Sequence, residues 1–194
     1  MSVETLCRRI DQLLTQRPQT LVAIDGACGS GKTTLAKQLQ ARYGGHVLQM
    51  DHFFLRPEQR TPARFAEPGG NVDYERFLAE VLTPLQADEP FYYRPFDCKT
   101  GQMGEGIEVL PGPLYIIEGS YSLHPTLVSA YHLNVFLTVD PAEQLRRLAL
   151  RDGGRLLQRF RDEWIPMEQR YFTHYEIAKQ CDFVMDTTKR EQQP

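Results

Sequence analysis

Residues 26–33 read Gly-Ala-Cys-Gly-Ser-Gly-Lys-Thr, which is the pattern G-x-x-x-x-G-K-[ST] of a phosphate-binding loop. The apolar run at 21–24 before it predicts a buried strand, and residues 34–40 after it have the spacing of a helix. In that context the glycines let backbone N–H groups surround phosphate oxygens, and the helix directs the positive end of its dipole towards them. The sequence therefore predicts a site for a nucleoside triphosphate.

The residues of this loop have expected roles in binding ATP and Mg²⁺, the two predicted cofactors. Lys32 places a positive charge near the β- and γ-phosphates, and the hydroxyl of Thr33 is a ligand for Mg²⁺. For Cys28 two interpretations stay open: a small loop side chain, or an oxidation-sensitive thiolate favoured by the positive field of the loop. The residues expected to contact the nucleotide are Gly26, Ala27, Cys28, Gly29, Ser30, Gly31, Lys32, Thr33 and Thr34.

The bulk composition limits the class of protein. The chain of 194 residues is long enough for one well-buried domain, 1–194, and its net charge of −3 argues against nucleic acid or an anionic membrane as a partner. No apolar run is long enough to span a membrane, and the first residues lack the pattern of a signal peptide. The four cysteines are far apart, with no C-x-x-C pair, which favours reduced thiols in the cytoplasm. The expected partner is a small-molecule acceptor, and homo-oligomerisation stays open.

Strands and helices alternate along most of the chain, which predicts a parallel α/β sheet covered on both faces. The expected strands are 21–24, 46–50, 114–117, 134–139 and 182–185, and the expected helices are 3–16, 31–43, 73–86, one from about 125, 141–152 and 155–179. Residues 56–71 read as an exposed excursion and 91–110 as a small hairpin-like insertion. We therefore divide the chain into a core at 20–55 and 111–187, an acceptor-binding insertion at about 56–110 and a lid at about 150–165.

Two carboxylates follow predicted strands at the sheet edge where ligands bind. Asp51, after the second strand, is suited to accept the proton of an attacking hydroxyl, and Glu118, after the third, to face the metal. The alternatives are a capping aspartate and a solvated glutamate. Gly119 stands where ATP-hydrolysing motors carry a second acid, which favours transfer over hydrolysis. His52 is interpreted as structural or peripheral because its side chain points the other way in an extended segment.

Arginines recur every four residues near the C-terminal end of the chain, at Arg147, Arg151, Arg155 and Arg159. Gly153-Gly154 interrupt the row, which suits a hinged lid better than a rigid helix. Guanidinium groups that close over the phosphates would neutralise charge on the transferring group. We expect Arg155 and Arg159 to be catalytic and Arg151 to bind the nucleotide; the alternative is a solvated helix with acidic neighbours.

Aromatic and polar residues gather in the predicted insertion. Tyr93, Arg94 and Phe96 lie close together in the sequence, after Asp73. Flat rings with convergent polar groups suit a planar base and a ribose diol. Ordinary packing of a small insertion explains the same rings, so both interpretations stay open.

Four segments in order resemble the uridine kinase/phosphoribulokinase family of P-loop kinases. They are Ile-Asp-Gly-Ala-Cys-Gly-Ser-Gly-Lys-Thr-Thr at 24–34, Met-Asp-His-Phe-Phe at 50–54, Gly-Asn-Val-Asp-Tyr at 70–74 and Ile-Ile-Glu-Gly at 116–119. With the arginine lid, the resemblance covers roughly residues 20–187. The phosphate loop is specific only to the superfamily of P-loop proteins. The second and fourth segments narrow the resemblance to this family.

The resemblance implies a three-layer α/β/α P-loop NTPase fold with a five-stranded parallel sheet. It also implies ATP-dependent phosphorylation of a nucleoside-like hydroxyl, with Asp51 as the base and Asp73 holding ribose hydroxyls. The expected acceptor contacts are Asp51, Phe53, Asp73, Tyr93, Arg94 and Phe96. Uridine–cytidine kinases commonly carry Tyr-Asp-Phe followed by a histidine, whereas residues 93–99 read Tyr-Arg-Pro-Phe-Asp-Cys-Lys with no histidine following. This departure leaves pyrimidine recognition open.

The predicted function is a small-molecule kinase with uridine as the first acceptor, and with nicotinamide riboside, pantothenate or a sugar as alternatives. A non-kinase nucleotide-binding protein is the competing class. The Asn-Lys-x-Asp tetrapeptide of GTPases is absent from the sequence, as are the acidic pair and the Leu-Ser-Gly-Gly-Gln stretch of transporter ATPases. A degenerate kinase would have lost the lysine or the base, and Lys32 and Asp51 are both present.

Overall fold

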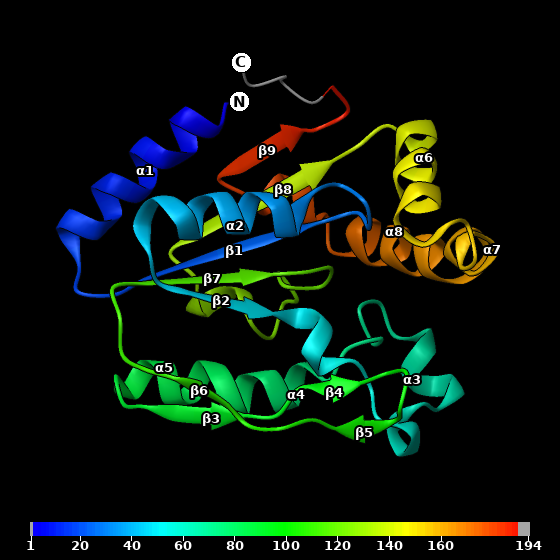
Figure 1. The fold of residues 1–194 in the computed structure, drawn as a ribbon, viewed down its shortest axis with the longest axis horizontal. Helices are drawn as coiled ribbons and strands as arrows, with labels where there is room; N and C mark the ends of the chain where they lie inside the picture. Colours follow the sequence, from blue (N-terminus) through cyan, green and yellow to red (C-terminus); the bar gives the residue numbers. More distant parts are fainter. Residues whose placement is uncertain (1, 190–194) are drawn as a thin grey trace.

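A five-stranded parallel sheet forms the centre of the protein in a computed structural model that describes residues 2–189 (Figure 1). The strand order is β2-β7-β1-β8-β9, and every neighbouring pair is parallel. The bounds are β1 Thr20–Gly26, β2 His46–Gln49, β7 Leu114–Glu118, β8 Leu133–Thr138 and β9 Phe183–Asp186. The expected three-layer fold with five parallel strands is confirmed.

Two apolar cores lie on opposite faces of this sheet because side chains alternate along each strand. In β1, Val22 and Ile24 pack under α1 (Val3–Gln16) and α2 (Lys32–Tyr43). Leu21 and Ala23 point to the other face, which α8 (Ile165–His174) and the insertion cover. Helices on both faces leave the carboxyl ends of the strands open at one edge.

The insertion contains a helical run and two short antiparallel ladders. The run consists of α4 (Tyr74–Phe77), the π-helix η3 (Leu78–Leu82) and α5 (Thr83–Ala87). The wide turn comes just before Pro84, where the Thr83 N–H donates to the Leu78 carbonyl. The ladders pair β3 (Phe91–Tyr93) with β6 (Ile107–Val109), and β4 (Phe96–Asp97) with β5 (Gln102–Met103), which confirms the hairpin-like segment. Before them, η2 (Pro57–Gln59), α3 (Pro62–Ala66) and η1 (Met50–Phe53) are single turns.

One helix prediction needs correction. The helix expected from about 125 is only a 3₁₀ turn, η4 (Val128–Ala130). The region expected to be helical over 155–179 is helical over most of its length: α7 (Leu157–Arg159), the π-helix η5 (Phe160–Trp164) and α8 follow one another without a break, and η6 (Ile177–Gln180) comes after them. The predicted break is confirmed, because α6 (Pro141–Asp152) ends at Gly153 and Gly154, both with positive φ.

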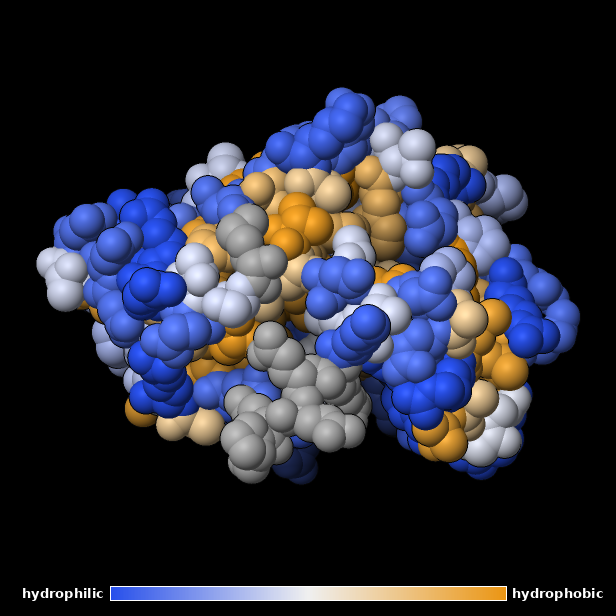
Figure 2. All heavy atoms as spheres, turned by 90° about the horizontal axis from the view of Figure 1, so that it is seen from above, coloured by the Kyte–Doolittle hydropathy of each residue, from blue (hydrophilic) through white to orange (hydrophobic). Residues whose placement is uncertain are grey.

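Seen from above, most of the surface is hydrophilic, and apolar residues show mainly near its middle (Figure 2). Among residues 2–189, no helix combines the length and apolar character needed to cross a bilayer.

Gly45, between α2 and β2, offers a test of this packing far from the ligand-binding edge. Its φ is +82°, and an added Cβ would lie 2.4 Å from the carbonyl oxygen of Leu114. We expect Gly45→Ala to lower the free energy of unfolding by about 3 kcal/mol, because it combines backbone strain with a steric clash. Gly101 has a φ of +71° but nothing within 4 Å of the added Cβ, so Gly101→Ala is the matched control. It should cost only about 1 kcal/mol in urea unfolding. Equal losses in the two variants would contradict the clash.

Candidate active site

One large cavity lies at the carboxyl edge of the sheet, and the regions singled out in the sequence line it. The phosphate loop and Glu118 come from the sheet core, Asp51 from η1, Phe96 from the insertion, and Arg151 from the end of α6. Parallel strands bring their carboxyl ends to one edge, which explains why segments so distant in sequence meet here.

The phosphate loop runs from the end of β1 to the start of α2, and α6 holds it from outside. Gln144 donates to the carbonyl of Cys28 at 2.9 Å, and Arg147 to that of Gly29 at 3.3 Å. All loop residues from Cys28 to Thr34 line the cavity. Gly26 and Ala27 do not; both are buried, which corrects their expected nucleotide contact.

Lys32 is turned towards its own loop. Its ammonium donates to the carbonyls of Gly26 at 2.7 Å and Ala27 at 3.0 Å, and to the hydroxyl of Ser120 at 3.2 Å. These three bonds use all three N–H groups of the ammonium. The charge therefore lies at the cavity wall and is satisfied by protein oxygens.

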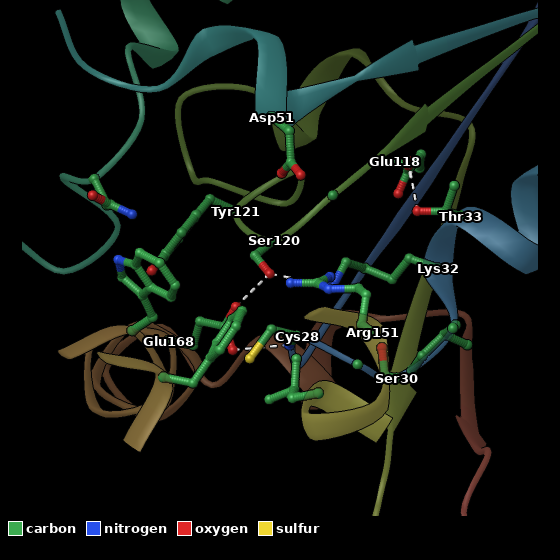
Figure 3. Close-up of a pocket in the computed structure, with 18 of the residues that line it drawn as sticks. Cys28, Ser30, Lys32, Thr33, Asp51, Glu118, Ser120, Tyr121, Arg151 and Glu168 are labelled. Atoms are coloured by element: carbon green, nitrogen blue, oxygen red, sulfur yellow. Dashed lines mark hydrogen bonds between the residues drawn. The ribbon is translucent and has the colours of Figure 1, made fainter. Parts of the chain in front are cut away.

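Thr33 and Glu118 form the expected pair. The Thr33 hydroxyl donates to Oε1 of Glu118 at 3.0 Å (Figure 3). Burial, assisted by the negative charge of Asp51, raises the pKa of Glu118 above its usual range. A divalent cation here would offset both carboxylates, and a hydroxyl with carboxylate oxygens is a donor set that suits Mg²⁺. The described residues contain no cluster of three or more His, Cys, Asp or Glu able to hold a metal, so the remaining ligands would be phosphate oxygens and water.

The arginine row is only partly directed into the cavity. Arg151 lines it, with its guanidinium 5.2 Å from the Phe160 ring centre. Arg159 also lines it and forms an ion pair with Glu163 at 3.1 Å. Arg155 is not among the lining residues, and its expected catalytic role stays a prediction. Gly153 and Gly154, both with positive φ, lie between Arg151 and Arg155 in the chain.

Arg147, the first member of the row, has a different role. It pairs with Glu143 at 2.7 Å and bonds to Thr187, as well as to the phosphate loop. This arginine joins α6 to the loop and to the segment after β9.

Of the residues expected to contact the acceptor, some line the cavity and others do not. Asp51 and Phe96 line it. Asp51 is exposed and points into it (Figure 3). Phe53 does not line the cavity, because its ring is fully buried against Phe77 and Tyr93, at centroid distances of 4.9 and 5.3 Å. The expected contact from Phe53 is therefore corrected to core packing.

Asp73 is likewise used by the fold. It is the N-cap of α4, where Oδ1 accepts from the Arg76 N–H at 3.0 Å, and its Oδ2 accepts from Gln59 at 2.8 Å. Only 2% of the residue is exposed and it does not line the cavity. The prediction that Asp73 holds ribose hydroxyls does not fit this arrangement, because its carboxylate is buried and lies away from the cavity.

Tyr93 and Arg94 also lie away from the cavity wall. Tyr93 is buried, which raises its pKa to about 12, and its hydroxyl lies 3.1 Å from Nδ1 of His52. Arg94 donates to the carbonyls of Gly104 and Met103 at 2.8 and 3.1 Å, so it holds the hairpin together. His52, interpreted above as peripheral, does line the cavity. Packing thus explains most of the aromatic cluster.

From the sequence alone, no role was predicted for three buried polar residues that lie next to the phosphate loop. Asp25, fully buried, accepts from the N–H groups of Gly26, Tyr121 and Leu123 and from the Tyr171 hydroxyl. The signal for it was an acid inside an apolar strand. Ser120 and Glu168, which bond to each other at 2.6 Å, carried no such signal.

The thiolate interpretation of Cys28 is wrong. The side chain is largely buried, and burial together with the nearby Glu168 carboxylate raises the pKa of the thiol far above its usual value. Cys28 is therefore a small, protonated loop side chain.

The metal pair predicts a selective effect of Thr33→Ala. Loss of the hydroxyl should weaken binding of ATP in the presence of Mg²⁺ by about tenfold, because a metal ligand is removed. Binding of ATP in excess EDTA should change little, and Thr33→Ser should restore the magnesium effect. Calorimetric titration measures all three, and an equal loss with and without magnesium would contradict the assignment.

Asp25 predicts a pH-dependent stability. Burial raises its pKa from 3.8 to about 6, so the folded state keeps a proton that the unfolded state releases, and stability falls as pH rises through this window. The Tyr171 hydroxyl, 2.9 Å from Oδ2, lowers that pKa. Without the Tyr171 hydroxyl, the pKa of Asp25 rises further, and stability continues to fall up to a higher pH. Tyr171→Phe should therefore cost about 1 kcal/mol more at about pH 8 than at about pH 4.

Tyr115→Phe is the matched control for this experiment. Tyr115 is buried and donates to the carbonyl of Leu110 at 3.1 Å, not to a carboxylate. Its cost in urea unfolding should not change over the same pH range. A cost of Tyr171→Phe that is equally flat would contradict the role of Asp25.

Comparison with known proteins supports a kinase. No protein-family model matches the chain. Proteins named uridine kinase from Bacillus thuringiensis (strain Al Hakam) and Bacillus anthracis are 26% identical over 165 residues, covering 78% of this chain and 76% of theirs.

Solved structures share the fold over nearly the whole chain. A protein from Bacillus stearothermophilus, described as a candidate uridine kinase, has a TM-score of 0.68 at 21% identity and covers 94% of this chain and 100% of its own. A candidate fructose transport system kinase from Silicibacter sp. TM1040 has a TM-score of 0.66 at 25% identity, with coverages of 95% and 99%. The chain has the P-loop kinase fold, and its relatives support a phosphotransferase.

Proposed function

We propose that the protein is an ATP-dependent kinase that transfers the γ-phosphate to a hydroxyl of a small molecule, with uridine or a related nucleoside as the first acceptor to test. The observation that carries this proposal is the position of Asp51. Its exposed carboxylate lies on the same cavity as Lys32 and the Thr33–Glu118 pair. A base beside a phosphate-binding loop is the arrangement that phosphoryl transfer to a hydroxyl requires.

The residues of the chain have distinct tasks in this reaction. Asp51 accepts the proton of the acceptor hydroxyl as that oxygen attacks the phosphoryl group. Lys32, Arg151 and Arg159 offer positive charge to the transferring group, and loop N–H groups orient the phosphates. When bound between Thr33 and Glu118, Mg²⁺ supplies charge neutralisation at the phosphate oxygens. Gly119 follows Glu118, so no second acid stands next to it to activate water.

A nucleoside acceptor is favoured by the relatives named uridine kinase and by the ring of Phe96 on the cavity wall. A sugar is the second candidate, favoured by the similarity to a candidate fructose transport system kinase. The burial of Asp73 also favours it, because this carboxylate does not line the cavity in which a ribose diol would bind. Nicotinamide riboside and pantothenate complete the set of acceptors. We further propose a cytoplasmic protein without nucleic-acid or membrane partners, and leave self-association to measurement.

The proposal predicts the behaviour of Asp51→Asn in an acceptor panel. With uridine, cytidine, nicotinamide riboside, pantothenate and fructose as acceptors, one class should give ATP consumption matched by a phosphorylated product. Asp51→Asn should lower kcat for that acceptor by about 10²–10⁴-fold, because the general base is lost. The Kd for ATP should stay within about twofold of the wild-type value, since the phosphate loop and Lys32 are unchanged in this variant.

Asp97→Asn is the control, because Asp97 is an exposed carboxylate on the same cavity whose oxygen accepts from the Lys99 N–H. Its effect on kcat should be small. ATP hydrolysis that needs no acceptor and is unchanged by Asp51→Asn would contradict the kinase proposal.

A further inference from the structure

A buried carboxylate from α8 binds the phosphate loop. Glu168 is 4% exposed, and its Oε2 accepts a hydrogen bond from the backbone N–H of Cys28 at 2.9 Å. Both residues line the cavity (Figure 3). Loop N–H groups of this kind bind anions, so a protein carboxylate stands at a position suited to an anionic ligand.

The same carboxylate is linked to the loop lysine. Oε1 of Glu168 accepts from the hydroxyl of Ser120 at 2.6 Å, and that hydroxyl oxygen accepts from Lys32 at 3.2 Å. Lys32 is 8% and Ser120 9% exposed, so this lysine–serine–glutamate chain is largely shielded from water. Opposite charges at its two ends stabilise each other more strongly there than at the surface.

A triphosphate disturbs both parts of this arrangement. For Lys32 to reach phosphate oxygens, it must give up bonds to Gly26, Ala27 or Ser120, which already use all its donors. Glu168 then faces the negative phosphates with less of its counter-charge. Like charges a few ångströms apart in a partly buried site repel strongly.

We propose that Glu168 is an internal anion that competes with the donor phosphates for the loop, and that nucleotide binding releases it and moves the lid. This inference rests on the proposed nucleotide site. Glu168 acts through Ser120 and the loop, so it is a positioning residue and not a catalytic one.

The position of Glu168 in the chain explains why its release would move the lid. It lies on α8, which continues directly from η5, and η5 follows α7. Trp164, at the end of η5, precedes Glu168 by one helical turn and lines the cavity. Its ring packs against Phe160 at 4.6 Å, and the Arg159 guanidinium lies 4.7 Å from its centre. Because Trp164 is the only tryptophan in the chain, its fluorescence reports on this segment alone.

Glu168→Gln tests the competition without an acceptor. Glutamine keeps an oxygen for the loop N–H but removes the negative charge. The Kd for MgATP should fall by about tenfold, a typical size for such a coupling. The Kd for adenosine, which carries no phosphate, should be unchanged. Glu176→Gln is the matched control, because Glu176 is an exposed carboxylate beyond α8 whose ion-pair partner is Lys179. It should bind ATP like the wild type.

The wild-type protein gives an independent measurement. Inorganic tripolyphosphate should change Trp164 emission by itself, because an anion on the loop is enough to release Glu168. In Glu168→Gln this change should be smaller, since the neutral side chain can stay on the loop N–H without being repelled by the bound anion.

Two results would overturn the inference: ATP binding by Glu168→Gln that is equal to or weaker than wild type, or tripolyphosphate that binds without altering Trp164 emission. The second result applies even if the variant does not fold. Failure of the wild type to bind ATP would overturn the nucleotide site and the inference together. Intact ATP binding without transfer to any acceptor would count against the proposed function alone.

Discussion

The donor site depends on the buried carboxylate of Asp25 at the end of β1. Its two oxygens accept from the N–H groups of Gly26, Tyr121 and Leu123 and from the hydroxyl of Tyr171. These donors belong to the phosphate loop, to the segment after β7 and to α8. A fully buried carboxylate is costly unless its hydrogen bonds are satisfied, so the three elements are held in one relative position. Burial raises the pKa of Asp25 by more than these hydrogen bonds lower it, because the pKa stays above its usual value.

Glu168 repeats this arrangement on the cavity side of the loop. Asp25 holds the loop from behind, where no ligand reaches, while Glu168 binds the Cys28 N–H within the cavity wall. The positive charge of Lys32 lowers the pKa of Asp25 and, through Ser120, is linked to Glu168. The loop is therefore already balanced between protein anions before a nucleotide arrives. Such a balance preorganises the loop, but it makes the carboxylate that lines the cavity a rival of the ligand.

The sequence predicted where the phosphate loop and the Thr33–Glu118 pair lie, because their positions follow local rules. The phosphate loop, its flanking strand and helix, and the meeting of Thr33 with Glu118 all follow from short-range pattern and parallel-strand geometry. Phe53 and Asp73 could not be placed, because their burial depends on how α4 and the rest of the insertion pack against η1. Glu168 left no local signal: its partner Cys28 is 140 residues away, and the helix that carries it begins after a π-turn.

The two halves of the cavity differ in what their polar groups are free to do. In the donor half, the hydroxyl of Thr33 donates to the Glu118 carboxylate at the proposed cation site. The atoms that form this hydrogen bond are therefore the atoms that would bind the ligand. In the acceptor half, Asp73 caps a helix and Arg94 joins two hairpin carbonyls, so their polar atoms already serve the insertion. In the proposed kinase, acceptor choice would then rest on the few side chains that still reach the cavity, such as Asp51, His52 and Phe96. An insertion that uses most of its polar groups for its own folding can change substrate through one or two substitutions, because the core that holds the phosphates is untouched.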